Sequence, residues 1–305
     1  MRNKFYFRLL GITGALALAG MSIVGMPAIG STSNAAPVGA AGEATSVATS
    51  TGRCLQIAVP VEDYEEYQEI LIPNDLLLAK ATRGIKPGSG SKFSFIEERY
   101  EEAKSRLMEL QNIPVRKGIV FSSYEDLENK IDDIKPYVDL VAYNSEGGMT
   151  PIEELSYPLP DYVTKCARLA RSRDLAVGWG PTSARLLMEP ELLELASKVD
   201  RIALQHQNVL ASQGVEATVS LTKQRSQEIR EFNPNIEINL VLKGDLKEIG
   251  DVLQQTVGDV DTLLILTKQG VPFDYQQLFD DVDLRSGCTG QHTLYLPLVW
   301  EPSGS

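Results

Sequence analysis

Short apolar runs recur along the chain, and most are followed by a stretch whose apolar residues recur at helical spacing. The runs have the length of strands that are buried on both faces. They lie at residues 55–60, 118–122, 138–144, 175–180, 201–207, 236–242, 262–267 and 293–299. Amphipathic stretches such as residues 124–134, 191–199 and 220–232 lie between them. Strands that alternate with helices predict parallel βα units.

Eight βα units fit a closed barrel better than an open sheet. We therefore expect an α/β fold, a single (β/α)8 barrel of the TIM type over residues 53–305. Residues 65–117 hold extra helix and a Gly/Ser-rich loop, so a helical insertion is expected after the first strand. A doubly wound open α/β sheet is the alternative. Beyond the strand–helix alternation, the sequence shows no internal repeat.

The first 36 residues have the order of a secretory signal peptide. Arg2, Lys4 and Arg8 precede an apolar stretch over residues 9–30, and small residues with a small-x-Ala pattern follow at 33–35. We expect residues 1–36 to be a cleaved signal peptide. The alternative is an uncleaved signal anchor, because 22 apolar residues are long enough to span a bilayer.

Cleavage would place the protein outside the cytoplasm, secreted or in the periplasm or at the cell surface, with no stable membrane span. Residues 37–52 are rich in Ser, Thr, Ala and Gly. Such a segment buries too little apolar area to offset its ordering entropy, so we expect a flexible leader there.

The charge balance is acidic, with 41 Asp and Glu residues against 29 Lys and Arg residues and a net charge of −12. A surface of this sign repels phosphate backbones, so we expect no nucleic-acid partner. Two histidines and three cysteines are too few for a His- or Cys-rich metal site, and we expect neither a metal nor a cofactor. None of these features indicates an oligomeric state.

Strand parity brings polar side chains together where the strands end. In the run 201–207, Gln205 and Gln207 share a face opposite the aliphatic Ile202 and Leu204. Active sites of (β/α)8 barrels lie at the C-terminal mouth, where amide groups suit a carbohydrate or another small polar ligand; a polar plug of the barrel is the alternative. The residues expected to bind such a ligand are Asn144, Gln205, Gln207, Asn239 and Lys243.

Glu146 is the first candidate for a catalytic residue. It shares parity with Asn144 and is followed by Gly147 and Gly148, which leave room for a ligand. A carboxylate in this position can serve as a general acid, as a nucleophile or as an acceptor for sugar hydroxyls. The alternative is an acid that caps the loop or forms an ion pair.

Hydrolysis of a glycosidic bond usually needs a second carboxylate. Glu62, after the first run, and Glu301, after the last, are the candidates. Tyr143, Trp179 and Trp300 are expected to contact the substrate, because aromatic rings offer a wall for a sugar ring. For Trp179, packing in the core is the alternative.

Three further positions have competing interpretations. Lys243 ends an inward face, and a desolvated lysine can form a Schiff base, with an ion pair as the alternative. His206 has the opposite parity to Gln205, which favours a structural role. Thr150 and Glu153 have the spacing of a capping box at the start of a helix.

Export makes disulfides permissible. Cys54 begins the first predicted strand and Cys288 precedes the last, and these strands are neighbours in a closed barrel. We therefore expect a Cys54–Cys288 disulfide at the N-terminal rim. Cys166 lies among apolar residues at helical spacing and is expected to be buried and unpaired.

The pattern Y-N-x-E-G…T-P-x-E-E from Tyr143, with Q-x-Q at Gln205, resembles a group of secreted, largely uncharacterised (β/α)8 proteins of the glycoside-hydrolase-like barrel superfamily. The likeness covers roughly residues 120–267. In that group an aromatic residue often follows the strand-end acid by two positions, where this chain has Gly148.

The resemblance implies the barrel fold and an exported protein that acts on or binds carbohydrate at the mouth. If the protein is an enzyme, a glycosidase-like hydrolase is expected. Two alternatives stay open: a non-catalytic ligand-binding or cell-surface barrel, and a Schiff-base lyase or aldolase that uses Lys243.

Overall fold

The computed structural model describes residues 54–85, 93–147, 149–155, 160–183, 186, 190–266, 273–285 and 288. These residues belong to one compact unit, Thr49–Ser305. The expected signal peptide and leader, the expected strand at residues 293–299, and Trp300 and Glu301 all lie outside the described residues. Within the described part, no helix is both long and apolar enough to cross a membrane.

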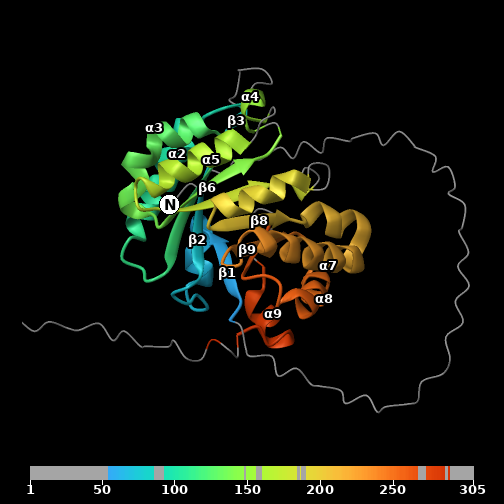
Figure 1. Ribbon diagram of the computed structural model, residues 1–305. Helices are drawn as coiled ribbons and strands as arrows, with labels where there is room; N and C mark the ends of the chain where they lie inside the picture. The colour runs from blue at the N-terminus through green and yellow to red at the C-terminus, as the bar shows by residue number, and fades with distance from the viewer. Residues whose placement is uncertain are drawn as a thin grey trace, which may run out of the picture. The chain divides into compact units, whose positions relative to one another are not determined.

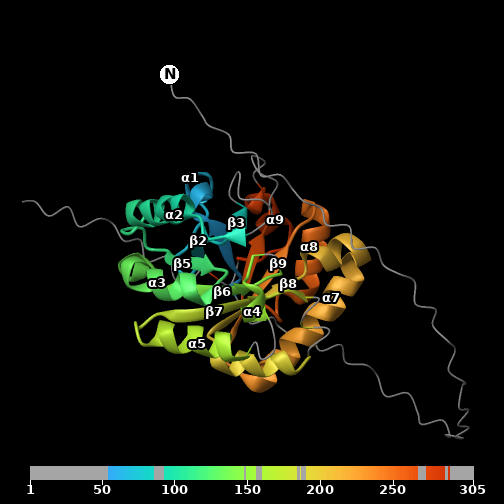
Figure 2. The ribbon, with the colours of Figure 1, turned by 90° about the horizontal axis from the view of Figure 1, so that it is seen from above.

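Eight strands of the described chain form a closed barrel in which every neighbouring pair is parallel (Figures 1 and 2). In barrel order they are β1 (Gln56–Pro60), β2 (Leu76–Ala81), β5 (Arg116–Phe121), β6 (Leu140–Ser145), β7 (Ala176–Pro181), β8 (Arg201–Gln205), β9 (Glu237–Leu242) and β10 (Thr262–Ile265). A separate antiparallel pair joins β3 (Gly84–Ile85) to β4 (Phe93–Ser94). The predicted (β/α)8 barrel is confirmed, and the open sheet is excluded.

Helices ring the barrel, as the view down its axis shows (Figure 2). They are α1 (Tyr64–Tyr67), α2 (Glu97–Glu109), α3 (Tyr124–Ile134), α4 (Ile152–Leu155), α5 (Pro160–Arg171), α7 (Gln207–Phe232), α8 (Leu246–Thr256) and α9 (Tyr275–Asp281), with 3-10 turns η1 (Val61–Asp63), η2 (Lys135–Tyr137) and η3 (Pro190–Lys198). In α3 the buried Leu127, Ile131 and Ile134 recur every three to four residues and form the stripe that faces the strands. Helix α7 is two helices joined at Gly214, whose φ of 81° favours glycine.

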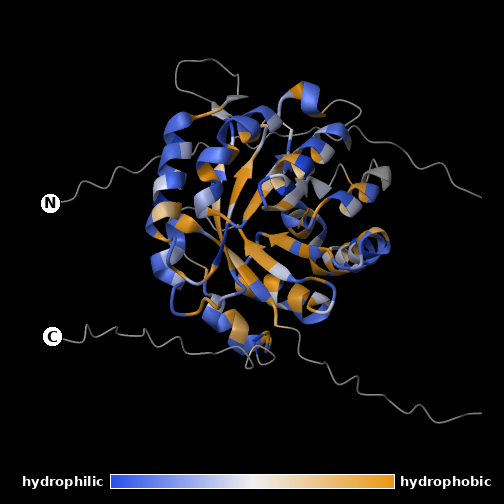
Figure 3. Ribbon diagram, turned by 60° about the vertical axis from the view of Figure 1, so that its left-hand side comes forward, coloured by the Kyte–Doolittle hydropathy of each residue, from blue (hydrophilic) through white to orange (hydrophobic). Residues whose placement is uncertain are grey.

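Apolar side chains fill two separate layers. The larger lies between strands and helices, so the strands are strongly hydrophobic and the helices present polar outer faces (Figure 3). The smaller lies inside the barrel and consists of Ala58, Leu76 and Leu140 with Leu78 and Leu264 against them. Because this inner cluster is small, polar side chains occupy both ends of the barrel interior.

The second strand and the closure of the barrel differ from the sequence prediction. Strand β2 lies inside the region 65–117 that was expected to be a helical insertion, and β10 pairs directly with β1. The sequence of β2, LLLAKA, consists of good helix formers, but burial between β1 and β5 overrides that propensity. The barrel therefore closes without residues 293–299, and β6 is its fourth strand.

Four aspartates repeat around the N-terminal end of the barrel. Each directly precedes a strand, and its carboxylate accepts the N–H of the second residue of the preceding strand at 2.8 Å. The pairs are Asp75 with Ile57, Asp139 with Lys117, Asp200 with Val177, and Asp261 with Ile238. Each aspartate carbonyl also accepts the first N–H of the next strand in barrel order, so these backbone groups at the strand starts are paired. This pattern of hydrogen bonds thus recurs at every second strand of the barrel.

The structure joins Cys54 and Cys288 in a disulfide, with a Cα–Cα distance of 4.8 Å. Cys54 precedes β1, and Cys288 follows α9. The chain after α9 returns to the N-terminal rim, where Leu55 donates its N–H to the Leu284 carbonyl at 3.3 Å. Cys166 is a buried free cysteine of α5, and burial raises the pKa of its thiol.

Candidate functional site

Asn144 and Glu146 meet at the C-terminal end of β6. Asn144 is half-buried on the inner face, while its neighbours Tyr143 and Ser145 are buried on the outer face. The Asn144 side-chain amide donates to Glu146 Oε2 at 3.1 Å. The amide therefore fixes one carboxylate oxygen and leaves the other for a different partner.

A chain of amide hydrogen bonds continues from Asn144 across β7 to β8. Gln205 Nε2 donates to Asn144 Oδ1 at 3.0 Å and to the Gly180 carbonyl at 3.1 Å. Gln207 Nε2 donates to Gln205 Oε1 at 3.4 Å. A Cβ on Gly180 would lie 3.0 Å from Asn144 Oδ1, so glycine is the residue that lets the two amides meet. We call Gln207, Gln205, Asn144 and Glu146 the amide chain.

Thr150 fixes the backbone that carries Glu146. Its hydroxyl accepts the Glu146 N–H at 3.1 Å and donates to the Asn144 carbonyl at 2.8 Å. The predicted capping box with Glu153 is wrong, because α4 begins at Ile152 and no hydrogen bond among the described residues joins Thr150 to Glu153. Glu153 is exposed.

Glu154, which the sequence did not single out, anchors the same loop. It is buried, and its carboxylate accepts from Ser123 Oγ at 2.9 Å, the Tyr124 N–H at 2.9 Å and Tyr143 Oη at 3.0 Å. These donors belong to β6 and to the start of α3, where a carboxylate is favoured by the helix dipole. Glu154 thus links the loop after β6 to the start of α3 and to β6 itself.

Two further carboxylates follow β1. Burial raises the pKa of Glu62, with added contributions from Asp63 and Glu102, while a backbone hydrogen bond and Lys80 oppose the rise. Burial also raises the pKa of Asp63, again against Lys80. The Glu62 residue is exposed at the surface, and Lys80 is exposed on the inner face at the end of β2. Lys80 lies in β2, whose helix-forming residues do not indicate a strand, so the sequence alone does not point to this lysine.

Tyr143 and Trp179 do not reach the mouth, so the expectation that they contact substrate is wrong. Both are buried between strands and helices. Trp179 Nε1 donates to Ser145 Oγ at 3.0 Å, and the Tyr143 hydroxyl donates to Glu154. Strand parity places both rings outward, away from Asn144.

The remaining described residues that the sequence singled out form no hydrogen bond with the amide chain. Lys243 is exposed, so the desolvation that a Schiff-base lysine requires is not present. Asn239 is half-buried in the barrel interior, and its Oδ1 has no hydrogen-bond partner among the described residues. His206 is buried behind β8, with Nδ1 2.9 Å from Thr222 Oγ1, and burial lowers its pKa to about 4. Its structural role agrees with the parity argument.

No family model and no curated protein matches the chain. Solved structures of similar fold include a glycoside hydrolase family 17 β-1,3-glucanosyltransferase from Rhizomucor miehei, at 11% identity over 68% of this chain and 85% of the other, with a TM-score of 0.44. A GH18 chitinase from Pseudoalteromonas aurantia has 12% identity over 69% of this chain and 93% of the other, with a TM-score of 0.45.

Phosphoribosyl anthranilate isomerase from Thermococcus kodakaraensis has 14% identity over 76% of this chain and 98% of the other, with a TM-score of 0.48. Similarity at this level concerns the fold alone, and the three proteins named have different activities. The chain is a (β/α)8-barrel protein with a polar C-terminal mouth.

Proposed function

We propose that this protein is an exported, glycosidase-like hydrolase that binds carbohydrate at the C-terminal mouth of the barrel. The observation that carries the proposal is the amide chain, which ends on the Glu146 carboxylate. Amide groups both donate to and accept from hydroxyl groups, and a carboxylate accepts from them, so the chain suits a polyhydroxylated ligand. The charged and apolar order of the first 36 residues supports export.

Glu146 and Glu62 take different roles in this proposal because their surroundings differ. Glu146 accepts a hydrogen bond from Asn144, which suits an ionised carboxylate that attacks the anomeric carbon or takes a proton from water. The raised pKa of Glu62 suits a carboxylic acid that donates its proton to the leaving oxygen.

The test compares Glu146→Gln and Glu62→Gln on polysaccharides and on aryl glycosides. Loss of a general acid or base typically lowers turnover about 10²–10⁴-fold. Glu146→Gln is expected to lose activity on both substrate types. Glu62→Gln should retain more activity on aryl glycosides, because a phenolate leaves without protonation.

Glu153→Gln is the matched control, since Glu153 is an exposed carboxylate of the same loop. Asp63→Asn decides whether the proton donor is Glu62 or its neighbour. Wild-type turnover in Glu146→Gln would remove Glu146 from catalysis and overturn the proposal.

A non-catalytic carbohydrate-binding barrel is the second candidate. It is favoured by the fact that Glu146 is the single carboxylate within the amide chain. Sugar binding by the wild type, weakened in Asn144→Ala and unaccompanied by turnover of any substrate in the panel, would identify this function.

A further inference from the structure

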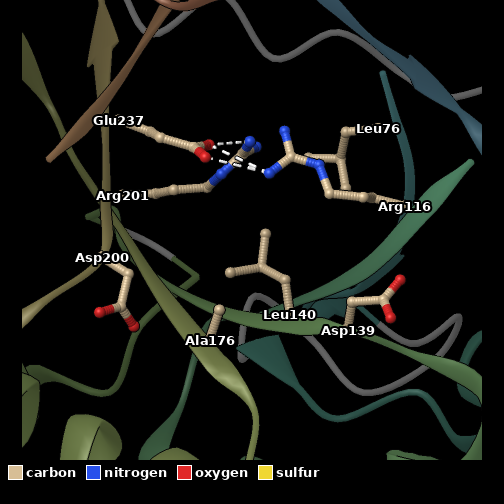
Figure 4. Close-up of a pocket in the computed structure, with 8 residues that line it drawn as sticks. All are labelled: Leu76, Arg116, Asp139, Leu140, Ala176, Asp200, Arg201 and Glu237. Atoms are coloured by element: carbon tan, nitrogen blue, oxygen red, sulfur yellow. Dashed lines mark hydrogen bonds and ion pairs between the residues drawn. The ribbon is translucent and has the colours of Figure 1, made fainter. Parts of the chain in front are cut away.

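A second polar cluster fills the opposite, N-terminal end of the barrel interior. Arg116 of β5 and Arg201 of β8 both form ion pairs with Glu237 of β9, and the Arg116 Nη1–Glu237 Oε1 distance is 3.0 Å (Figure 4). Both guanidinium groups also donate to Gln56 Oε1 of β1, Arg201 at 3.3 Å. The Thr262 hydroxyl donates to the same oxygen at 3.2 Å. Two arginines therefore share one carboxylate and one amide oxygen.

The cluster has one positive charge in excess. Asp139 and Asp200 lie close by, but their carboxylates point away from the arginines (Figure 4). Asp139 accepts the Lys117 N–H, and Asp200 accepts the Val177 N–H and a bond from Arg171. Asp261, which also acts on Arg201, is paired with Arg230 and accepts the Ile238 N–H. Glu237 is therefore the acid that forms ion pairs with both arginines of the cluster.

Arg201 is the more deeply buried arginine of the cluster. Its side chain is 5% exposed, and burial lowers its pKa to about 10, with Arg116 acting in the same direction and Glu237 against it. Its Nη1 atom is buried and has no hydrogen-bond partner among the described residues. A buried charged donor without a partner is costly, and a bound anion would supply the missing acceptor.

A cavity of about 90 Å³ adjoins the two arginines. Leu76, Leu140 and Ala176 give it an apolar side, and Asp139, Asp200 and Glu237 also line it. Ala176 is exposed, so solvent reaches the cavity at this end of the barrel. One water takes roughly 30 Å³ of liquid, so the cavity has room for about three or four non-hydrogen atoms.

We propose that the N-terminal end of the barrel is a binding site for a small carboxylate of one or two carbons, held by Arg116 and Arg201. Arg116 also donates to the Asn74 carbonyl, so the unpaired Arg201 Nη1 is the donor that would bond a carboxylate oxygen. The anion would neutralise the excess positive charge of the two arginines. The apolar side accommodates the short alkyl group. This site shares no residue with the amide chain at the mouth, so anion binding here does not depend on the proposed hydrolase activity.

Acetate is the probe, titrated into the mature protein by calorimetry and by thermal melting against chloride at equal ionic strength. Acetate should bind at one site per chain and raise the melting temperature in a saturable way, because it binds the folded state alone. No saturable heat, or equal shifts by acetate and chloride, would overturn the proposal.

Two variants move the acetate affinity in opposite directions. Arg116→Gln removes one charged donor and should weaken binding about tenfold or more. Glu237→Gln removes the competing carboxylate while keeping its shape, so it should tighten binding. Arg173→Gln is the control, since Arg173 forms an exposed ion pair with Asp132. Unchanged affinity in both cluster variants would contradict the assignment even if acetate binds elsewhere.

Discussion

Arg285 and Asp75 form an ion pair that ties the chain after α9 to the start of β2. Arg285 Nη2 donates to both carboxylate oxygens of Asp75, at 3.2 and 3.0 Å. The Asp75 side chain is fully buried and also accepts the N–H groups of Ile57 and Ile72 at 2.8 Å each. Burial raises the pKa of Asp75, while Arg285 and the two N–H groups oppose the rise. The pair lies on the segment that the disulfide at Cys288 also holds.

Replacing Arg285 by Met should therefore destabilise the protein strongly. The change leaves a buried carboxylate without its cation, and loss of one partner from a buried pair typically costs about 3–5 kcal/mol. Urea unfolding measures the loss. Arg173→Met, which removes an exposed partner of Asp132, should shift the urea midpoint little. Equal midpoints for the two variants would show that the Arg285–Asp75 pair does not contribute as argued.

The Cys54–Cys288 disulfide should stabilise the fold by closing a loop of 234 residues. Replacing both cysteines by serine should cost about 2–4 kcal/mol in the chain-entropy view. Thiol titration of the unreduced, denatured protein should find one free thiol per chain, that of Cys166, and the native protein should react slowly because Cys166 is buried. Three reactive thiols in the unreduced protein would exclude the disulfide.

Glu62→Gln should stabilise the protein increasingly as the pH rises. The folded-state pKa of Glu62 lies above its ordinary value of 4.5, so between these two values the folded state binds more protons than the unfolded state. Stability of the wild type then falls as pH increases through that window, and the variant lacks this contribution.

Thermal melts of wild type and Glu62→Gln between about pH 3.5 and 8 measure this difference. It should be near zero at the acidic end and constant above the folded-state pKa. A difference that is largest at low pH would have the wrong sign and would show that the fold favours the charged form of Glu62.

Gly180→Ala should break the amide chain, because the new Cβ would lie 3.0 Å from Asn144 Oδ1 and 3.5 Å from Gln205 Nε2. Overpacking of this kind typically costs about 1–3 kcal/mol. Carbohydrate turnover or binding should fall with it. Gly250→Ala in helix α8 is the control, since its Cβ would make only ordinary contacts, at 3.6 Å and beyond. Equal loss of function in the two variants would argue against a role for the amide chain.

The mature protein should begin between Ala35 and Thr51. The basic residues, apolar stretch and small residues of the first 36 positions are the basis of this prediction. N-terminal sequencing of protein from its native host measures the start directly. An intact Met1 on a membrane-bound form would favour the uncleaved anchor instead.

Local pattern was sufficient for most strands of the barrel and for the direction of several side chains at its mouth. In β8 the aliphatic Ile202 and Leu204 alternate with Ala203 and Gln205, and the structure buries the first pair under the helices. The same parity places Asn144 inward and His206 behind its strand. These inferences succeeded because side-chain direction in a strand has a period of two and needs no knowledge of distant residues.

The same parity, applied strictly, also argues for Tyr143 and Trp179 as core residues. The expectation that they contact substrate followed from the chemistry of aromatic rings instead, and the structure contradicts it. Three of the four aspartates at the N-terminal end of the barrel follow a valine, at 138–139, 199–200 and 260–261. The sequence does not show that each carboxylate accepts a backbone N–H of the preceding strand.

Only the tertiary structure decided which strands close the barrel and which charged groups meet at its ends. Strand β2 has helix-forming residues, and its state depends on burial between β1 and β5. Arg116, Arg201 and Glu237 come from β5, β8 and β9, and Glu154 reaches Ser123 from 31 residues away. Such contacts depend on strand register and on where each loop packs against the neighbouring elements. A single sequence carries the periodicity of each strand but not the pairing between strands, because pairing is set by the burial and hydrogen bonding of the whole barrel.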